Sequence, residues 1–137
     1  MRRYALPAVL FFAAASSASS VAAPPHSDDE IAEKILGNWV SVQTPEQIPD
    51  HLLIRFAQGG TARAWFFRDD SCKEVLVRSD IRWRVDAGVL ITSYPEGYSD
   101  HDVVQDIGDK TITLLSVERR EPYTRARSES CQPPKEF

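Results

Sequence analysis

The sequence is poor in the residues from which active sites are usually built. Its 137 residues include three histidines, two cysteines and six glycines. It contains no CxxC pair, no glycine-rich phosphate-binding loop, and no recognisable pairing of a serine or cysteine nucleophile with a histidine base. These absences argue against zinc fingers, nucleotide-binding folds and nucleophilic hydrolases. We therefore expect a protein that is not an enzyme and that holds neither a metal nor a cofactor.

Long hydrophobic runs are also absent, apart from one at the N-terminus. Residues 1–3 are basic at two positions, Tyr4 to Ala15 is apolar, and Ser16 to Ala23 is rich in small residues. This order is typical of a secretory signal peptide, and the apolar run is shorter than the roughly 20 residues that a membrane-spanning helix needs. We expect residues 1–22 to be a signal peptide and the mature protein, with no membrane span, to be periplasmic or secreted.

Positive charge is scarce in the mature chain. Cleavage after residue 22 removes two arginines and no acid, so 16 − 2 = 14 basic residues remain against 20 acidic ones, a net charge of −6. This sign disfavours nucleic acid and anionic membranes as partners. The two cysteines, Cys72 and Cys131, predict one disulfide in an exported chain, with free thiols or a metal site as the alternatives.

A short helical pattern follows a leader that contains two prolines. Ser27 and Glu30 have the spacing of a capping box, and Gly37 follows the pattern where a helix would end. The apolar residues that share one helical face are Ile31, Ile35 and Leu36. We expect residues 23–36 to form a leader and a short helix that covers one end of a sheet.

After Gly37 the apolar residues recur at every second position, which indicates β-strands. The expected strands are Trp39 to Gln43, Leu52 to Gln58, Thr61 to Phe67, Glu74 to Val85, Val89 to Tyr94, His101 to Ile107, Lys110 to Glu118 and Pro122 to Ser128. Gly59-Gly60 is the strongest hairpin signal, because a two-residue turn needs positive φ angles. Short turns join most of the strands without helical crossovers. Residues 37–131 are therefore expected to form an all-β domain, either a barrel or a sandwich, and residues 132–137 a flexible tail.

Four motifs, in this order and spacing, resemble those of the small bacterial lipocalin-like domains of the calycin superfamily. They are Gly37-Asn38-Trp39; Ile54-Arg55-Phe56 with Gly59-Gly60-Thr61; Trp83 to Val85 before Leu90; and Leu114-Leu115 before Tyr123-Thr124-Arg125. The resemblance covers Leu36 to about Arg127. It implies an up-and-down antiparallel β-barrel of about eight strands. It also implies that an arginine of the last strand packs across Trp39 at the closed end. Arg125 matches that position, and Arg127 has the same strand parity.

Two clusters could carry a function beyond the fold. Trp65-Phe66-Phe67 places large rings on both faces of a strand, so one face is core and the other is covered by the N-terminal helix or exposed to a partner. Arg63 shares the side that Trp65 takes; it would select an anionic head group if it faces inward, or pair with carboxylates on a solvated outer face. In Asp100-His101-Asp102 the two aspartates are expected on one face and His101 apart from them, as a charge cluster at a strand edge.

The function that the resemblance implies is binding of a small apolar or amphipathic ligand. The candidate ligand-binding residues are Phe56, Arg63, Trp65, Trp83, Tyr94 and Tyr98, and the candidate structural residues are Gly37, Trp39, Arg125, Cys72 and Cys131. The open end is expected at the Gly59-Gly60 turn, the Asp86-Ala87-Gly88 turn or the Tyr94 to Asp100 loop. The alternatives are an exported interaction protein or enzyme inhibitor, and an envelope protein without a ligand. The partner is expected to be a hydrophobic ligand or a protein, and the barrel a monomer.

Overall fold

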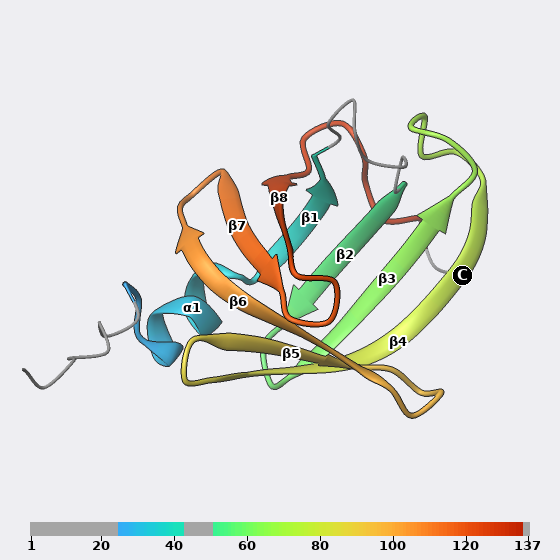
Figure 1. Cartoon of the computed structure of the whole chain (residues 1–137). Coiled ribbons are helices and arrows are strands. Elements are labelled where there is room, and N and C mark those ends of the chain that lie inside the picture. The colour runs from blue at the N-terminus through green and yellow to red at the C-terminus, as the bar shows by residue number, and fades with distance from the viewer. Residues whose placement is uncertain (1–24, 43–50, 136–137) are drawn as a thin grey trace, which may run out of the picture.

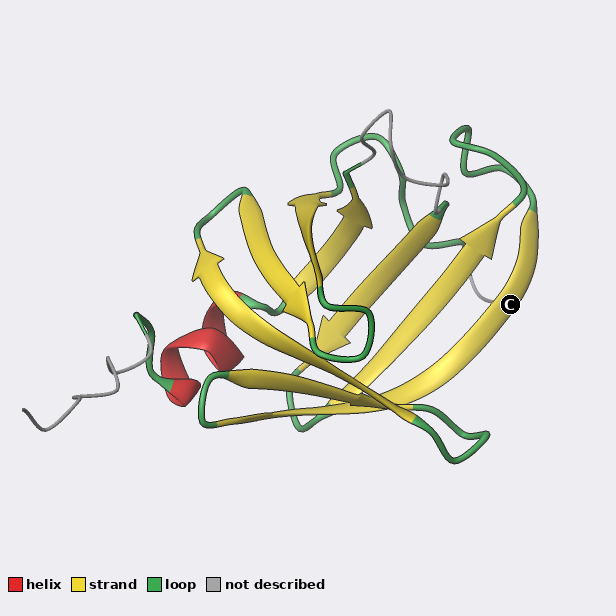
Figure 2. Cartoon of the chain, viewed as in Figure 1, coloured by secondary structure: helices red, strands yellow, loops and turns green. Residues whose placement is uncertain are grey.

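The computed structural model describes residues 25–42 and 51–135, and in them one short helix is followed by eight strands (Figures 1 and 2). The elements are α1 (Asp28–Lys34), β1 (Gly37–Ser41), β2 (Leu52–Ala57), β3 (Thr61–Phe67), β4 (Val75–Asp86), β5 (Val89–Ser93), β6 (Ser99–Ile107), β7 (Thr111–Ser116) and β8 (Glu121–Arg127). Each strand pairs antiparallel with its neighbour in the sequence, and β8 closes on β1. The prediction of an all-β up-and-down barrel with a short N-terminal helix is confirmed. The predicted signal peptide and the connection from residue 44 to residue 50 lie outside the described residues.

Helix α1 covers one end of the barrel, as expected. The Ser27 hydroxyl accepts the Glu30 N–H at 3.2 Å, which confirms the N-terminal cap. The Asp28 carboxylate accepts the N–H groups of Ala87 and Gly88 at 2.9 and 2.8 Å, so the helix start is attached to the β4–β5 turn. The helix contributes Ile31 and its C-cap residue contributes Ile35, and both side chains are fully buried in the barrel core. Nowhere in the described ranges is a helix long and apolar enough to cross a membrane.

An arginine packs across Trp39 at this end, but it is Arg127 and not Arg125. The guanidinium carbon of Arg127 lies 4.0 Å from the centre of the Trp39 ring, whereas that of Arg125 lies 5.3 Å from the Tyr123 ring. The reason is the register of the β1–β8 pair, in which Trp39 is directly opposite Arg127 and Arg125 is opposite Ser41. The two arginines share a strand face, and the pairing places Arg125 nearer the other end of the barrel.

The two faces of β3 divide the aromatic cluster. Ala62, Ala64 and Phe66 pack with the barrel interior, whereas Trp65 and Phe67 belong to a separate cluster on the outer face. Strand alternation places Arg63 on that outer face too, so the expectation that Arg63 and Trp65 line an interior ligand site is wrong.

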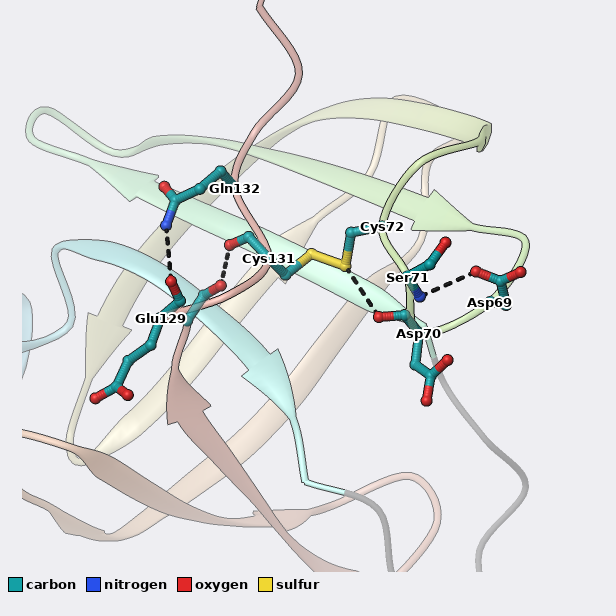
Figure 3. Close-up of a disulfide and its surroundings, with 8 residues drawn as sticks. Asp69, Asp70, Ser71, Cys72, Glu129, Cys131 and Gln132 are labelled. Carbon is teal, nitrogen blue, oxygen red and sulfur yellow. Dashed lines mark hydrogen bonds between the residues drawn. A yellow bond between two sulfur atoms is a disulfide. The ribbon is translucent and has the colours of Figure 1, made fainter.

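The outer aromatic pair is covered, but not by helix α1. Cys72 and Cys131 form the predicted disulfide, with their Cα atoms 5.6 Å apart (Figure 3). Cys131 and Cys72 pack with Leu53, Trp65 and Phe67 in the outer cluster. The C-terminal segment is therefore attached across the outside of the barrel, and Trp65 is only 3% exposed.

The ends of the barrel follow from the strand registers. Phe56, at the end of β2, is opposite Gly37, so the β2–β3 turn lies at the end from which β1 starts. The β4–β5 turn is bonded to α1, so it also lies at the closed end. Of the three alternatives for the open end, the Gly59-Gly60 turn and the Asp86-Ala87-Gly88 turn lie at the closed end, and the Tyr94 to Asp100 loop lies at the open end.

The β2–β3 connection also differs in length from its prediction. Ala57 pairs with Thr61, so the turn has three residues rather than two, and Gln58 belongs to the turn instead of the strand. Gly59 and Gly60 both have positive φ, +87° and +84°, as the hairpin signal requires.

Candidate functional site

A cavity of about 300 Å³ opens at the end of the barrel opposite α1. It is lined by Leu52, Ile54, Phe56, Phe66, Leu90, Thr92, Tyr94, Tyr98, Asp100, Asp102, Ser116, Glu118, Arg119, Tyr123 and Arg125. The lining comes from β2, β3, β5, β6, β7 and β8 and from two loops at the open end. Its volume is at the lower limit of the range for small-molecule sites. We refer to this cavity as the lumen.

The deep part of the lumen is apolar. Phe56 meets Trp83 edge to face, with ring centres 5.6 Å apart and planes at 88°. The Trp83 indole N–H donates to the backbone oxygens of Ala57 and Thr61 at 3.1 and 2.9 Å, so its only polar atom is satisfied away from the cavity. Trp83 therefore supports the floor from behind Phe56 and does not line the lumen.

The upper part of the lumen carries a buried carboxyl group, that of Asp102. Asp102 is 6% exposed and is directly opposite Leu90 in the β5–β6 pair, so it points to the interior. Burial raises the pKa of Asp102 above its ordinary value, while the hydrogen bond from Tyr123 and the positive charge of Arg125 act in the opposite direction. The Tyr123 phenol is a hydrogen-bond donor at neutral pH, and burial raises its pKa further above the ordinary value. The site thus holds an acid and a donor next to each other beneath the mouth.

Two arginines flank the same tyrosine. The guanidinium carbons of Arg119 and Arg125 lie 5.4 and 5.3 Å from the centre of the Tyr123 ring. Arg125 also donates to the Ser41 hydroxyl at 3.4 Å. Arg119 comes from the β7–β8 loop and Arg125 from β8, so one hairpin supplies both cations and the tyrosine between them. The mouth therefore offers both a positive group and a carboxyl group to a ligand head.

Aromatic rings form one side of the mouth. Tyr94 and Tyr98 stack with ring centres 4.5 Å apart and planes at 17°. The Tyr94 N–H donates to the Tyr98 oxygen at 2.9 Å, and the Gly97 N–H donates to the Tyr94 oxygen at 3.0 Å, so the loop is a tight turn. Burial raises the pKa of the Tyr94 phenol, helped by the negative charge of Asp100. Tyr98, in contrast, is 55% exposed and presents its outer ring face to solvent.

The lumen contains three of the six predicted ligand-binding residues: Phe56, Tyr94 and Tyr98. Of the others, Trp83 lies behind the floor, and Arg63 and Trp65 lie on the outside of the barrel. The expectation that Asp100 and Asp102 share a face is confirmed, because both line the lumen. His101 lies apart from them and contacts Glu118, with 2.6 Å between its Nδ1 and the carboxylate.

The sequence did not identify five polar residues that line the lumen, namely Thr92, Ser116, Glu118, Arg119 and Tyr123. It also placed Arg125 against the Trp39 ring instead of in the lumen. Strand parity was the available signal for the residues on strands, since Thr92 shares a face with Leu90 and Tyr123 with Arg125. Arg119 had no such signal, because it lies in a loop. In the part of the chain that the structure describes, no three His, Cys, Asp or Glu side chains are grouped as a metal site.

Comparison of the chain with protein-family models, with curated proteins and with solved structures found no match. The closed eight-strand barrel agrees with the lipocalin-like resemblance, but other up-and-down barrels share this architecture. A barrel of this kind can carry many functions, so the chemistry of the lumen decides which ligand it can hold.

Proposed function

We propose that the protein is an exported binding protein that holds a small amphipathic ligand in the lumen. The observation that carries the proposal is the division of this cavity into an apolar floor and a charged mouth. Leu52, Ile54, Phe56 and Leu90 would contact the apolar part of the ligand, and Arg125, Asp102 and Tyr123 its polar head. The disulfide supports export, because such bonds persist in oxidising compartments. We further propose that the barrel acts without catalysis and as a monomer.

The size of the lumen limits the ligand. A volume of about 300 Å³ accommodates a single ring system or a short acyl chain, and a longer chain would extend past Tyr98 into solvent. Each Å² of apolar surface that the ligand buries contributes about 25 cal/mol, so burial of about 200 Å² would supply roughly 5 kcal/mol before the costs of association. About 5 kcal/mol corresponds to a Kd of roughly 0.2 mM, so micromolar affinity requires the head group to supply at least about 3 kcal/mol more, in addition to offsetting the costs of association.

The test is a titration with a fluorescent short-chain fatty-acid analogue, monitored by the fluorescence of the bound dye. Thr92 is 4% exposed and lines the lumen, so Thr92→Trp should fill the cavity and abolish binding. The matched control is Thr111→Trp, at an exposed position of β7, which should bind as the wild type does. Absence of binding by the wild type at about 50 μM, or equal binding by both variants, would contradict the proposal.

The alternative is an interaction protein or enzyme inhibitor that uses the open end as a docking surface. The large hydrophobic residues exposed in residues 25–42 and 51–135 all lie toward that end: Val42, Val75, Leu76, Val77, Tyr98 and Val117. The two functions separate experimentally. Thr92→Trp should leave partner capture unchanged, whereas Leu76→Ser, outside the lumen lining, should reduce partner capture and leave dye binding intact.

A further inference from the structure

We infer that the outer face of β2, β3 and β4 carries a second binding site, which takes an extended acidic peptide segment of a partner protein. A groove of about 640 Å³ lies on this face, outside the barrel and independent of the lumen. Three arginines line it, Arg55, Arg63 and Arg82, together with one carboxylate, that of Asp80. The whole chain has a net charge of −4, so a groove with an excess of positive charge is a local exception.

The charges in this groove do not all stabilise the folded barrel. Arg55 and Arg63 are directly opposite each other in the β2–β3 pair, where like charges are destabilising. Asp80 neutralises Arg63, with 2.6 Å between the Nε and the carboxylate oxygen. Among the described residues, neither Arg55 nor Arg82 has an ion-pair partner. Two guanidinium groups are therefore available to an incoming anion.

The two available arginines lie in adjacent rows of the same face, Arg55 on β2 and Arg82 on β4, with β3 between them. Arg55, Arg63 and Asp80 form one cross-strand row, and Ala57, Thr61 and Arg82 form the next row on the same face. Such rows are two residues apart along a strand, about 7 Å, which is also the distance between alternate side chains of an extended peptide. Neighbouring strands are about 4.8 Å apart, so the Cα atoms of Arg55 and Arg82 are about 12 Å apart, and acidic side chains at positions i and i+4 of an extended peptide, about 13 Å apart, can reach both arginines. The small side chains of Ala57 and Thr61 leave the hollow between them.

The C-terminal segment forms part of the groove wall. Pro133 and Pro134 line the groove, two and three residues after Cys131, whose disulfide attaches this segment to the barrel. Prolines carry no N–H, so they add an apolar wall beside the Trp65 ring without donating hydrogen bonds across the hollow. The volume is far larger than a single phosphate or carboxylate needs, which favours a peptide that runs beside this segment over an isolated anion.

The experiment is fluorescence anisotropy with the disulfide-bonded protein and a labelled peptide of sequence Gly-Glu-Gly-Glu-Gly-Glu-Gly. We expect saturable binding that weakens with added salt, and at least about tenfold weaker binding of the peptide with glutamine at each glutamate. Arg55→Gln and Arg82→Gln should each weaken binding about threefold or more. The matched control is Arg84→Gln: Arg84 also points outward from β4, but it lies outside the groove and is 3.5 Å from the Asp86 carboxylate. This control should bind as the wild type does.

Four results would overturn the inference. They are no binding of the peptide, equal loss in Arg84→Gln and Arg55→Gln, displacement of the peptide by an equal concentration of inorganic phosphate, and tighter binding of a short DNA duplex than of the peptide. Thermal unfolding of each variant by circular dichroism identifies any that fails to fold, and the remaining arginine variant then decides. Because Thr92→Trp alters only the lumen, it should bind the peptide normally, so failure here and failure of the proposed function are distinguishable.

Discussion

The guanidinium group of Arg127 lies between the Trp39 ring and the C-terminus of helix α1. Its carbon is 4.0 Å from the ring centre, and its Nη2 donates to the Lys34 oxygen at 2.6 Å. A second hydrogen bond runs from Nη1 to the Leu36 oxygen. A cation here satisfies carbonyl groups that the helix leaves unpaired and interacts favourably with the helix dipole. One side chain of the last strand thus joins β8, β1 and α1 at the closed end.

Trp39→Ala should lower the free energy of unfolding by about 3 kcal/mol or more, because a fully buried ring is lost and a cavity remains. Arg127→Ala should cost less, and the two changes should be coupled by about 1 kcal/mol, the scale of a partly desolvated cation–π contact. Urea denaturation of the four members of the double-mutant cycle gives the coupling energy. The control cycle pairs Trp39→Ala with Arg125→Ala, for which the coupling should be close to zero. Coupling in the second cycle but not the first would contradict this account.

Gly37→Ala should destabilise the protein through contact with Arg127. A Cβ atom at residue 37 would lie 2.8 Å from the Arg127 Nη1, and the φ angle of +109° is unfavourable for alanine. Gly97→Ala is the matched control, because Gly97 has a similar φ of +97° but nothing within 4 Å of the added atom. We expect the first variant to lose about 1–3 kcal/mol more than the second. In an Arg127→Ala background this excess should shrink, and its persistence there would show that the contact is not the cause.

Reduction of the Cys72–Cys131 disulfide should loosen the outer cluster and leave the barrel folded. The barrel core does not include the disulfide, which packs with Trp65, Phe67 and Leu53. Closure of a 59-residue interval gives an upper estimate of about 4 kcal/mol for the stability that is lost. Far-UV circular dichroism should be retained, while tryptophan fluorescence shifts to the red as Trp65 becomes solvated. Loss of the far-UV signal on reduction at 25 °C would contradict this prediction.

Asp102→Asn should change how stability depends on pH. Burial raises the folded-state pKa of Asp102 above its ordinary value of 3.8, so the wild type loses stability from this group as the pH rises through the folded-state pKa. Asparagine does not ionise, so the unfolding free energy of the variant relative to the wild type should increase between pH 3.5 and pH 7, starting from about the ordinary carboxyl pKa. Asp69→Asn is the opposite case, because hydrogen bonds from Ser71 lower the pKa of Asp69. A difference for Asp102→Asn that stays flat with pH would contradict the predicted shift.

Local patterns in the sequence predicted most of the secondary structure. The hydrophobic alternation located all eight strands to within about two residues, because it reflects burial of one face and needs no knowledge of the partner strand. Ser27 and Glu30 predicted the helix start for the same reason, since a cap is made within three residues. The cysteine count predicted the disulfide because the chain contains only one possible pair.

The lumen could be predicted only in part. Parity placed Asp100 and Asp102 on one face, but it could not show that this face is the interior. At Trp65-Phe66-Phe67 both faces are apolar, so alternation alone does not distinguish inside from outside. The structure makes Phe66 the interior residue because the C-terminal segment and its disulfide cover the other two rings. The residues that cover these rings lie about sixty positions later in the chain, so no local sequence pattern predicts the contact.

The choice of arginine at Trp39 shows most clearly how local sequence patterns differ from tertiary contacts in what they specify. The sequence by itself determined that Trp39 lies in the first strand and that Arg125 and Arg127 share a face of the last, since both follow from short-range periodicity. Only the tertiary structure decided between the two arginines. The choice depends on the register of β1 against β8, which are separated by almost the whole barrel in the chain and meet only when it closes. A shift of two residues in that register would keep every side chain on its face and exchange the arginines, so the decision belongs to closure of the barrel.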